Sequence, residues 1–474
     1  MDTLVALYQR LPLPARSAAA TLRGLYLRYW REGGERARLE EEARNRDTWT
    51  TEQWRAWREE RLAVLLHRAA TRVPYYREQW AARRQRGDRS SWDRLEHWTV
   101  LEKDAVRATP RAFVADDCDI RRMYHERTSG TTGKPLETWR SLAMVRTLYA
   151  IVDARTRAWD GIPRGARFAR LGGQLVVPPK QPSPPFWVWN AAMRQLYMSV
   201  YHLSPALIPH YLDALAEYRI EYLAGYTSSL HALALEALRL GHRDLRMIAA
   251  FTNAEPLSPD QRATISAAFH CPVRDSYGMA EAVAMGSECA HGRLHLWPEM
   301  GLVEVHGADG PVAPGTLGEL VCTGLLNVDM PLIRYRVGDR GRLAPEDSAC
   351  PCGRTLPQLS EVAGRTSDVL VTRDGRQVFW LNPVFYGLPV REAQIVQETL
   401  DRVRVLVAPA PRFTAHDARR IVERLRDRMG PVTVTLEYVE AVPRTAGGKV
   451  RAVVCALNGG ERAAALHRAP QATA

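Results

Sequence analysis

The spacing of apolar side chains predicts helices throughout the first 110 residues of the chain. The clearest helix runs from Thr51 to Thr71, where apolar side chains recur at near-helical spacing. These side chains are Trp54, Trp57, Leu62, Leu65 and Leu66. The helix is expected to end at Val73-Pro74, because proline lacks the backbone N–H that a continuing helix needs. The tryptophans of this region are best interpreted as core packing and not as a surface on which bases stack.

Helical and strand-like segments alternate in the middle of the chain, which predicts an α/β arrangement. Helices are expected at Leu142 to Trp159, Pro205 to Tyr218, Ser228 to Gly241 and Ser258 to Phe269. Residues 165–177 favour a strand and a turn, Met247 to Phe251 favours a short strand, and the proline-rich segment 178–185 favours a loop. In folds of this kind, ligands collect at the carboxyl ends of the strands.

The last third of the chain predicts a β-rich part followed by a small separate domain. Strands are expected at Leu317 to Val321 and at Pro331 to Tyr335. Residues 369–455 favour a small domain with strands at Val403 to Val407 and Val432 to Tyr438 and a helix from Thr414 to Met429. Thr414 and Asp417 fit the capping box that starts such a helix.

The expected fold class is therefore α/β, with a large N-terminal domain and a small, mobile α+β C-terminal lid. The large domain is expected to combine sheets packed with helices and a β-subdomain. We place the helical N-terminal part at 1–110, the ligand-binding core at 111–363 and the lid at 364–474.

Composition places the chain among ordinary globular proteins. Its 474 residues suffice for two or three domains, and 46% of them are hydrophobic and 25% charged. The formal net charge of +12 comes from scattered arginines, which favours anionic small molecules such as ATP or CoA. No RRM, zinc-finger or basic-helix pattern accompanies the charge, so we do not expect a nucleic-acid partner.

Cysteine use and hydropathy predict a cytoplasmic protein. Seven cysteines, an odd number, do not describe a disulfide framework. The N-terminus lacks the apolar core of a signal peptide, and no apolar run reaches 18 residues, so no integral membrane segment is expected. The segment Leu25 to Arg31, rich in Trp, Tyr and Arg, could lie at a membrane interface, but a packed or solvated helix is the favoured interpretation.

The most informative polar stretch is Arg127 to Leu136, which reads RTSGTTGKPL. Glycines let backbone N–H groups converge on one point, hydroxyls add neutral donors, and a lysine adds a cation. Such a loop suits a triphosphate, although it is not a Walker A loop, because Pro135 follows the lysine where Ser or Thr should stand. A polar surface turn is the alternative. The candidate phosphate-binding residues are Thr128, Ser129, Gly130, Thr131, Thr132, Gly133 and Lys134.

Four further motifs follow this loop in order, and the set resembles a known superfamily. They are Tyr277-Gly278-Met279-Ala280-Glu281, Arg334-Tyr335-Arg336-Val337-Gly338-Asp339, Gly364-Arg365-Thr366-Ser367-Asp368 and Pro443-Arg444-Thr445-Ala446-Gly447-Gly448-Lys449. Together they resemble the adenylate-forming superfamily of acyl-CoA synthetases, NRPS adenylation domains and luciferases. The match looks closest to the phenylacetate–CoA ligase branch and its CapK-like members, and it covers nearly the whole chain.

The resemblance implies roles for individual residues. Asn253, Ala254 and Glu255 would lie along the adenine, and Asp275, Ser276, Tyr277, Gly278 and Met279 would continue the nucleotide site, with the tyrosine ring packed on the adenine. Glu281 offers a hard oxygen for Mg²⁺, and the carboxylate of Asp339 would accept hydrogen bonds from the ribose. Arg365 would reach the ribose or phosphates. Ala280 departs from the pattern, because the family usually has threonine before this glutamate.

The lid carries the residue that we expect to assist the chemistry most directly. The hinge motif departs at Ser367, where the family has a carboxylate or lysine, although Asp368 follows and small polar residues tolerate rotation. Lys449 follows two glycines on a loop that could swing into the site and out again. Its cation would stabilise the negative charge that develops as a carboxylate attacks the α-phosphate of ATP. An exposed turn lysine is the alternative.

A cluster of cysteines and histidines predicts a structural zinc site. Cys350 and Cys352 form a two-thiol turn, and Cys289 lies near two histidines in the sequence. Cys₃His is a usual structural zinc set, which here would comprise Cys289, His295, Cys350 and Cys352, with His291 as the alternative fourth ligand. The CapK-like branch carries similar cysteines. Unligated buried thiols are the alternative interpretation.

The function expected from these residues is ATP-dependent adenylation of a carboxylic acid, with release of pyrophosphate, followed by transfer of the acyl group to CoA. An aryl acid is the family default, and a homodimer is compatible with the resemblance. The region Val371 to Trp380 differs from the usual pantetheine loop, with Arg373-Asp374-Gly375-Arg376 in its place, so an amine or a carrier-protein thiol is the alternative acceptor. A basic nucleic-acid binder and a non-catalytic relative are alternatives from other classes, but they leave the phosphate loop, Asp339 and Lys449 without a purpose.

Overall fold

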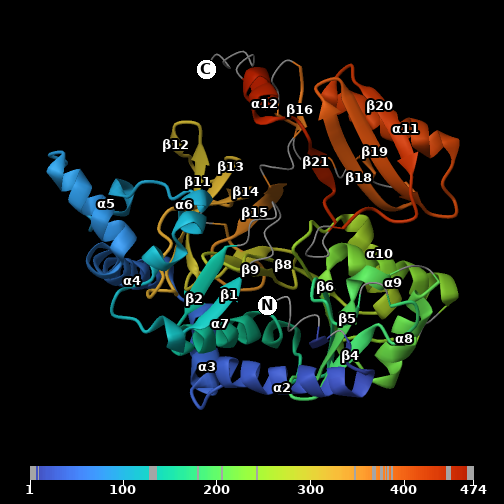
Figure 1. Cartoon of the computed structure of the whole chain (residues 1–474), viewed down its shortest axis with the longest axis horizontal. Coiled ribbons are helices and arrows are strands. Elements are labelled where there is room, and N and C mark those ends of the chain that lie inside the picture. Colours follow the sequence, from blue (N-terminus) through green and yellow to red (C-terminus); the bar gives the residue numbers. More distant parts are fainter. Residues whose placement is uncertain are drawn as a thin grey trace.

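A computed structural model shows the arrangement of the chain (Figure 1). The structure describes residues 7–8, 10–127, 136–178, 181–203, 206–241, 244–345, 348–365, 370–373, 377–378, 381, 384–385, 388–444 and 450–466. In that part of the chain, no helix is both long enough and apolar enough to cross a membrane. The fold class predicted from the sequence is confirmed as mixed α/β, with a large N-terminal part and a small C-terminal one.

The N-terminal region consists of helices, as the apolar spacing predicts. They are α2 (Leu13–Arg31), α3 (Arg36–Arg46), α4 (Thr51–Arg72), α5 (Pro74–Gln85) and the short α6 (Lys103–Ala108). Helix α4 starts with a capping box in which Thr50 and Gln53 satisfy each other's backbone N–H groups. It ends at Val73 as expected, and Pro74 then serves as the first residue of α5, where its missing N–H costs nothing.

The largest sheet has eight strands in the order β10-β9-β8-β7-β6-β3-β5-β4. These strands are β3 (Phe168–Gly172), β4 (Trp187–Asn190), β5 (Gln195–Ser199), β6 (Tyr222–Tyr226), β7 (Ala250–Asn253), β8 (Val273–Gly278), β9 (Met285–Glu288) and β10 (Leu294–Leu296). The five central strands β5, β3, β6, β7 and β8 run parallel. Strands β4, β9 and β10 at the margins run antiparallel to their neighbours.

Helices α7 (Leu142–Arg155), α8 (Ile208–Glu217), α9 (Thr227–Leu240) and α10 (Pro259–Phe269) accompany this sheet. Apolar residues of α8, α9 and α10 form one continuous core with the sheet, including Tyr211, Leu233 and Phe269. Helix α9 ends at Gly241, whose positive φ of 72° suits the left-handed position after a helix. The strand predicted at Met247 to Phe251 lies slightly later, at Ala250–Asn253.

A second, antiparallel sheet has five strands in the order β12-β11-β13-β14-β15. They are β11 (Gly301–Gly307), β12 (Gly310–Pro311), β13 (Gly318–Gly324), β14 (Tyr335–Leu343) and β15 (Leu359–Arg365). Its core is shared with α4 and α5, where Leu65, Leu66 and Trp80 are buried. Trp54 is buried as well, which confirms the interpretation of these tryptophans as packing residues.

The strand predicted at Pro331 to Tyr335 is wrong, because strand β14 only begins at Tyr335. The preceding segment bonds partly to side chains, and it meets other backbone only at single points, such as the carbonyl of Leu332, which accepts from the N–H of Gly324. The N–H of Ile333 donates to Tyr76 Oη at 3.1 Å, and that of Arg334 donates to Thr323 Oγ1 at 2.9 Å. Arg334 also has a positive φ of 48°, which takes the chain out of the extended conformation.

The C-terminal part forms a small sheet with the order β20-β19-β18-β21. Its elements are β18 (Val390–Thr399), β19 (Arg402–Pro409), α11 (Ala415–Met429), β20 (Thr433–Tyr438), β21 (Val453–Cys455) and α12 (Gly459–Leu466), preceded by the short strands β16 (Leu370–Val371) and β17 (Gln377–Val378). The predicted capping box of Thr414 and Asp417 starts α11. Figure 1 shows this part in orange and red beside α9 and α10.

Candidate functional site

The carboxyl ends of two adjacent parallel strands form the floor of the candidate site. Strand β7 ends at Asn253 and β8 at Gly278, and Asn253 lies opposite Ser276 in their shared register. The hydroxyl of Ser276 donates a 2.7 Å hydrogen bond to the carbonyl of Thr252, which fixes the serine on its neighbouring strand. The sequence segments 253–255 and 275–279 therefore lie side by side, at the edge where α/β folds bind ligands.

Tyr277 and Asp339 join this edge to the five-stranded sheet. The hydroxyl of Tyr277 donates to Asp339 Oδ2 at 3.0 Å. Asp339 follows Gly338, whose φ of 84° lies in the left-handed region that favours glycine, within strand β14. In the adjacent strand, Arg365 is the register partner of Asp339, so the structure brings three predicted residues together. The side chain of Arg365 lies outside the described part of the chain.

Asp275 lies below this floor in a largely enclosed position. Its Oδ1 accepts hydrogen bonds from Thr252 Oγ1 and from the N–H of Ser276, both at 2.9 Å. Burial raises the pKa of Asp275 from 3.8 to about 6, and the neighbouring carboxylate of Glu288 raises it further against these hydrogen bonds. Asp275 therefore supports the two strands from within and is a poor candidate for direct contact with a nucleotide.

Glu281 is buried and already has a cationic partner. The ammonium of Lys103 lies 2.7 Å from Glu281 Oε1, and Tyr335 Oη donates to the same oxygen at 2.9 Å. Burial alone would raise the pKa of Glu281, but the charge and hydrogen bonds of these neighbours outweigh it and lower the pKa. The carboxylate is thus held in its ionised form inside the protein, which is the form that a metal cation requires.

Sequence reasoning missed Lys103, although composition contains a signal for it. The chain has 65 Lys and Arg residues, of which only Lys103, Lys134, Lys180 and Lys449 are lysines. Two of these four lie in the expected nucleotide-binding motifs. In a chain that otherwise uses arginine, a retained lysine indicates a position that needs a compact ammonium.

Glu255 links the end of β7 to the C-terminal part of the chain. Its Oε2 accepts from the N–H of Ser228 at 2.7 Å, and its Oε1 accepts from the N–H of Val450 at 2.9 Å. The residue keeps some solvent exposure, but protein atoms surround its carboxylate, and this burial raises the pKa of Glu255. Ala254 before it adopts a positive φ of 64°, which is uncommon for a residue other than glycine.

Arg444 makes a second connection at the same place. Its Nη1 donates to Ser228 Oγ at 3.0 Å, and its Nη2 pairs with Glu392 of strand β18. Arg444 and Val450 also form an isolated β-bridge with each other. The two ends of segment 445–449 are therefore paired beside Glu255, whereas Lys449 itself lies outside the described residues.

The predicted phosphate loop, which runs from Thr128 through Gly133 to Lys134, also lies outside the described residues. Its flanks are described: β1 (Tyr124–Arg127) and β2 (Glu137–Arg140) pair antiparallel, with Arg127 opposite Glu137. The predicted loop thus connects the two strands of a hairpin. Met279 contributes to the core shared with the five-stranded sheet, and Gly278 is exposed.

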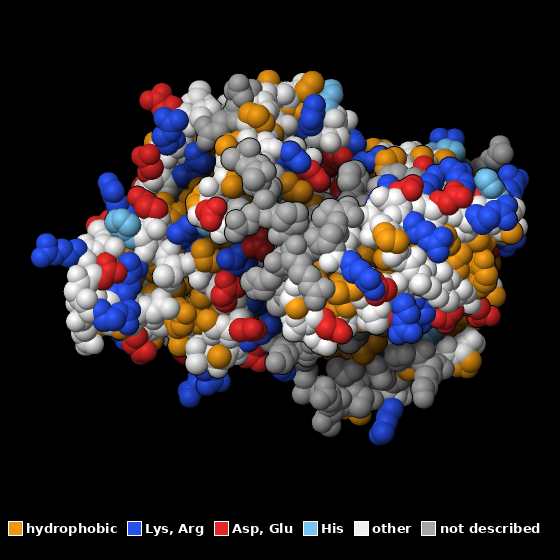
Figure 2. Space-filling view, turned by 90° about the horizontal axis from the view of Figure 1, so that it is seen from above, with side chains coloured by type: hydrophobic (Ala, Val, Ile, Leu, Met, Phe, Trp, Pro, Cys, Tyr) orange, Lys and Arg blue, Asp and Glu red, His pale blue; other side chains and the backbone are white. Residues whose placement is uncertain are grey.

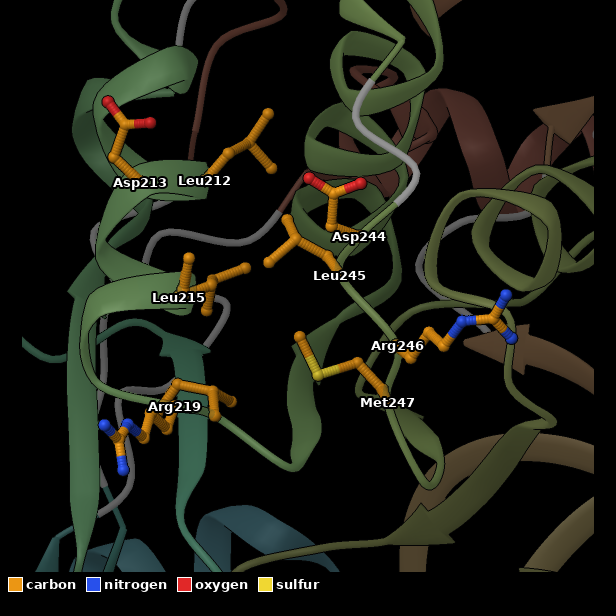
Figure 3. Close-up of a pocket in the computed structure, with 10 residues that line it drawn as sticks. Leu212, Asp213, Leu215, Arg219, Asp244, Leu245, Arg246 and Met247 are labelled. Carbon is orange, nitrogen blue, oxygen red and sulfur yellow. The ribbon is translucent and has the colours of Figure 1, made fainter.

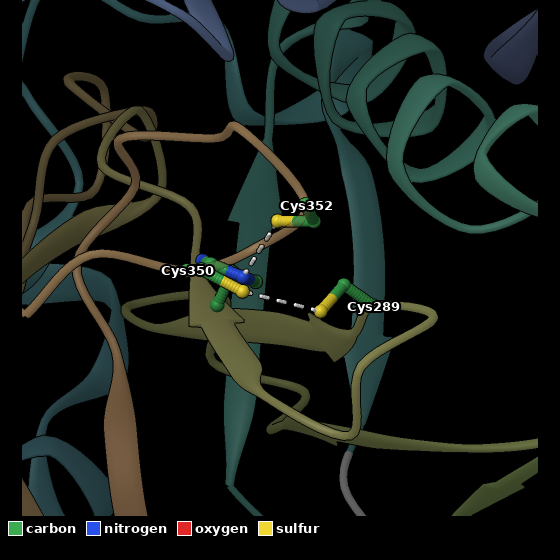
Figure 4. A group of neighbouring side chains, drawn as sticks. Cys289, Cys350 and Cys352 are labelled. Carbon is green, nitrogen blue, oxygen red and sulfur yellow. Dashed lines mark hydrogen bonds between the residues drawn. The ribbon is translucent and has the colours of Figure 1, made fainter.

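The structure brings together the four predicted zinc ligands (Figure 4). The ligand atoms of Cys289, His295, Cys350 and Cys352 all lie within 4.8 Å of one another. Cys289 Sγ is 3.7 Å from Cys350 Sγ, and Cys352 Sγ is 3.4 Å from His295 Nε2. Four ligands arranged tetrahedrally at zinc distances would be separated by about 3.5–3.8 Å, and these two distances lie close to that range.

The histidine alternatives differ clearly. His295 is fully buried on β10, and its Nδ1 lies 3.2 Å from the carbonyl of Leu356, which leaves Nε2 directed at the thiols. His291 is exposed and does not belong to the cluster. The cluster connects the β9–β10 end of the large sheet to the turn before β15.

A separate pocket lies away from these residues (Figure 3). It has a volume of about 280 Å³ and lies between the end of α8 and the segment before β7. Leu212, Leu215 and Met247 form apolar walls, while Arg219 and Asp244 stand at its rim. None of the predicted site residues lines this pocket, so it is separate from the candidate site.

Comparisons with known proteins agree with the resemblance seen in the motifs. The family described as CapK C-terminal domain matches residues 370–456. Protein CapK of Staphylococcus aureus is 29% identical over 331 residues, which cover 68% of this chain and 72% of that protein. A phenylacetate-coenzyme A ligase of Thermus thermophilus is 28% identical over 459 residues, which cover 86% and 98% of the two chains.

The fold also matches solved structures. The crystal structure of a 2-hydroxyisobutyryl-CoA ligase, in its postadenylation state with an acyl-AMP, aligns with a TM-score of 0.67 and 21% identity. The alignment covers 88% of this chain and 92% of that one. The chain is thus similar in sequence to CapK and to phenylacetate-coenzyme A ligases, its residues 370–456 match the CapK C-terminal domain, and its fold is that of the 2-hydroxyisobutyryl-CoA ligase.

Proposed function

We propose that the protein is an AMP-forming ligase that activates a carboxylic acid with ATP and transfers the acyl group to CoA. The observation that carries this proposal is the contact of Glu255 with Ser228 and Val450. It holds the ends of the loop that bears Lys449 at the carboxyl ends of the central strands, where Tyr277 and Asp339 also meet. The homologues named as phenylacetate-coenzyme A ligases support the same reaction class.

In the proposed reaction, the substrate carboxylate attacks the α-phosphate of ATP, and the bond to pyrophosphate breaks. Asp339 would accept hydrogen bonds from the ribose hydroxyls, and segments 253–255 and 276–279 would line the adenine, with Asp275 supporting them from within. Residues 128–134 would bind the phosphates, with Arg365 close to the ribose and phosphates. Lys449 would offset the charge that develops on the attacking carboxylate and the α-phosphate. No side-chain nucleophile is required, because positioning and charge supply the catalysis.

Glu281 is the residue that we propose for binding Mg²⁺. The buried, ionised carboxylate suits a hard cation, and both described contacts are made through its Oε1. Mg²⁺ would neutralise phosphate charge in the bound nucleotide. The ammonium of Lys103 supplies positive charge that keeps this carboxylate ionised.

We also propose that the Cys₃His cluster binds a structural zinc ion, since its four donor atoms lie within 4.8 Å of one another and belong to a usual zinc ligand set. The ion would tie the large sheet to the five-stranded sheet, remote from the reacting atoms.

The proposal also covers the substrate, the acceptor and the C-terminal part of the chain. An aryl acid is the first substrate to test, CoA is the proposed acceptor, the C-terminal part from residue 364 acts as a mobile lid, and we expect a cytoplasmic enzyme that forms a homodimer.

The decisive experiment measures pyrophosphate release on a panel of aryl, hydroxy and amino acids, with and without CoA. We expect release with at least one acid, formation of its CoA thioester, and a loss of at least about 100-fold on Lys449→Ala. Lys180→Ala is the matched control, because Lys180 belongs to none of the motifs. Release that is unaffected by Lys449→Ala, or absent with every acid, would overturn the proposal. Acyl-AMP that is consumed only by an amine would replace CoA as the acceptor.

A further inference from the structure

Helix α2 buries one side and leaves large apolar side chains on the other. Its buried residues are Gly24, Leu27 and Trp30. A Cβ at Gly24 would lie 2.2 Å from Asn190 Oδ1, so this side fits tightly against the edge strand β4. The opposite side presents Leu22, Leu25, Tyr26 and Tyr29, which are 67%, 52%, 45% and 61% exposed.

These four exposed side chains form one continuous stripe. Their spacing of i, i+3, i+4 and i+7 places them within about 100° of the helix circumference and over about 10 Å of its length. We call them the α2 stripe. Single exposed apolar residues are ordinary on protein surfaces, but two leucines and two tyrosines in one stripe indicate a surface that contacts something apolar.

Arginines predominate among the charges around the α2 stripe, although Glu32, just beyond the end of the helix, pairs with Arg28 at 3.1 Å. From Thr3 to Arg31 the chain contains five arginines and no aspartate, glutamate or lysine. Arg23 and Arg28, both exposed, project about 60° beyond the two margins of the stripe. The guanidinium of Arg23 lies 4.6 Å from the ring centroid of Tyr26, at the border between apolar and charged surface.

This surface differs from the rest of the molecule. Figure 1 shows α2 on the side of the molecule opposite the C-terminal part, so a contact there leaves the C-terminal part unobstructed. Figure 2 shows a different face, viewed from above, where Lys and Arg side chains are interspersed with Asp and Glu. That face therefore lacks the arginine-rich margin that the sequence places beside the α2 stripe.

We propose that α2 docks the protein onto the surface of an anionic lipid bilayer. Leu22 and Leu25 would enter the boundary between headgroups and acyl chains, and the tyrosines would sit at headgroup level, where amphipathic rings are favoured. Arg23 and Arg28 would contact lipid phosphates on either side. The helix would lie in the plane of the interface, held to the protein by its buried side.

Charge disfavours a second copy of this chain as the occupant. Two α2 stripes facing each other across a two-fold axis would bring arginines of both copies together, and on each copy Glu32 is already engaged with Arg28. The stripe is also short for a stable dimer, which needs about 800 Å² of surface on each partner. An anionic bilayer satisfies both the apolar stripe and its positive margin.

The test is flotation of the full-length protein with vesicles of phosphatidylglycerol and phosphatidylcholine, compared with vesicles of phosphatidylcholine alone. We expect binding to the anionic vesicles that weakens with added salt. Leu22→Ser combined with Leu25→Ser should weaken it about tenfold, as should Arg23→Gln combined with Arg28→Gln. The matched control is Leu238→Ser with Leu240→Ser, two exposed leucines at the end of α9.

Circular dichroism and pyrophosphate release without vesicles should be unchanged in all variants, because none of these residues belongs to the proposed active site. The proposal is overturned if the wild-type protein does not bind anionic vesicles, or if both α2 variants bind as tightly as the control. Equal binding to uncharged vesicles would exclude the role of the arginines. A dimer that dissociates only in the leucine variant would assign the stripe to a second copy instead.

Discussion

Glu255 Oε1 accepts a 2.9 Å hydrogen bond from the N–H of Val450, the residue that follows Lys449. The other oxygen of the same carboxylate accepts from the N–H of Ser228 at the start of α9, where the helix dipole favours negative charge. One side chain thus fixes the end of a central strand, the start of a helix and the C-terminal loop. In the proposed reaction, Glu255 is therefore a positioning residue, which acts on the loop and not on the reacting atoms of the substrate.

Glu255→Gln should therefore impair adenylation by loosening the loop. Both carboxylate oxygens accept backbone N–H groups, and a glutamine has only one oxygen, so one contact must break. The loss of a hydrogen bond to a charged group costs about 1.5–3 kcal/mol, and we expect pyrophosphate release to fall at least about tenfold. Hydrogen exchange at the amide of Val450 should accelerate in parallel. Glu59→Gln, on the exposed side of α4, is the control.

A slower exchange of Val450 in the variant, or full activity with rapid exchange, would show that Glu255 does not position the loop. This pair of readouts separates positioning from a direct catalytic role, because a residue that acted only on substrate would leave the exchange rate unchanged.

Removal of Lys103 should lower the free energy of unfolding, because Glu281 would then be a buried carboxylate without its cationic partner. Lys103→Met leaves a carboxylate that is only 5% exposed without its 2.7 Å partner. The lysine itself is 31% exposed, so solvent screens part of the interaction, and we expect a loss of about 1–3 kcal/mol in the free energy of unfolding. Urea unfolding at neutral pH measures it.

The pH dependence of this effect has a definite sign. The pKa of Glu281 is lowered in the folded protein, so its ion pair stabilises the fold above the unfolded-state pKa. That stabilisation is lost as the pH falls through the folded-state pKa, and the variant should approach the wild type there. Lys103→Met with Glu281→Gln should recover stability relative to Lys103→Met alone; equal instability of both would argue against the pair.

The cysteine–histidine cluster should bind about one zinc ion per chain. His295→Ala and Cys352→Ser should each abolish this content and lower the melting temperature, since a structural ion stabilises only the folded state. His291→Ala and Cys455→Ser are matched controls, because neither residue belongs to the cluster. Metal analysis of the purified protein provides the measurement. Zinc retained by His295→Ala but lost by His291→Ala would reverse the ligand assignment.

The sequence predicted best those features that depend on neighbouring residues. The limits of α4, the capping box of α11 and the left-handed end of α9 each follow from residues within a few positions. Segments 253–255 and 275–279 were assigned to one site from the family resemblance, and their meeting in the structure follows from parallel strands that end at one edge. The cysteine cluster could be named because so few residue types prefer zinc.

Features that depend on side chains distant in the sequence could not be predicted from local patterns. Strands β4 and β5 follow a proline-rich stretch and pair with each other, and β5 also pairs with β3, which precedes that stretch. Local patterns do not reveal these pairings. The partnership of Lys103 with Glu281 and Tyr335 joins three separate elements. The strand predicted before Tyr335 failed because Tyr76, far away in the sequence, satisfies its backbone.

Asp275 should destabilise the fold at neutral pH, because burial raises its pKa from 3.8 to about 6. Between these values the folded chain holds a proton that the unfolded chain has released, so the free energy of unfolding falls as the pH rises. Above about pH 6 the full penalty applies, at most about 3 kcal/mol for a shift of this size. Below about pH 4 the contribution vanishes, because the carboxyl is protonated in both states.

Asp275→Asn should remove this penalty while its Oδ1 still accepts from Thr252 and Ser276. The variant should therefore be more stable than the wild type above pH 6, and the difference should shrink steadily towards pH 4. Urea unfolding across this range gives the measurement, with Asp309→Asn in the exposed turn between β11 and β12 as control. A difference that stayed constant with pH would mean that the carboxyl titrates alike in both states, and that burial does not govern its charge.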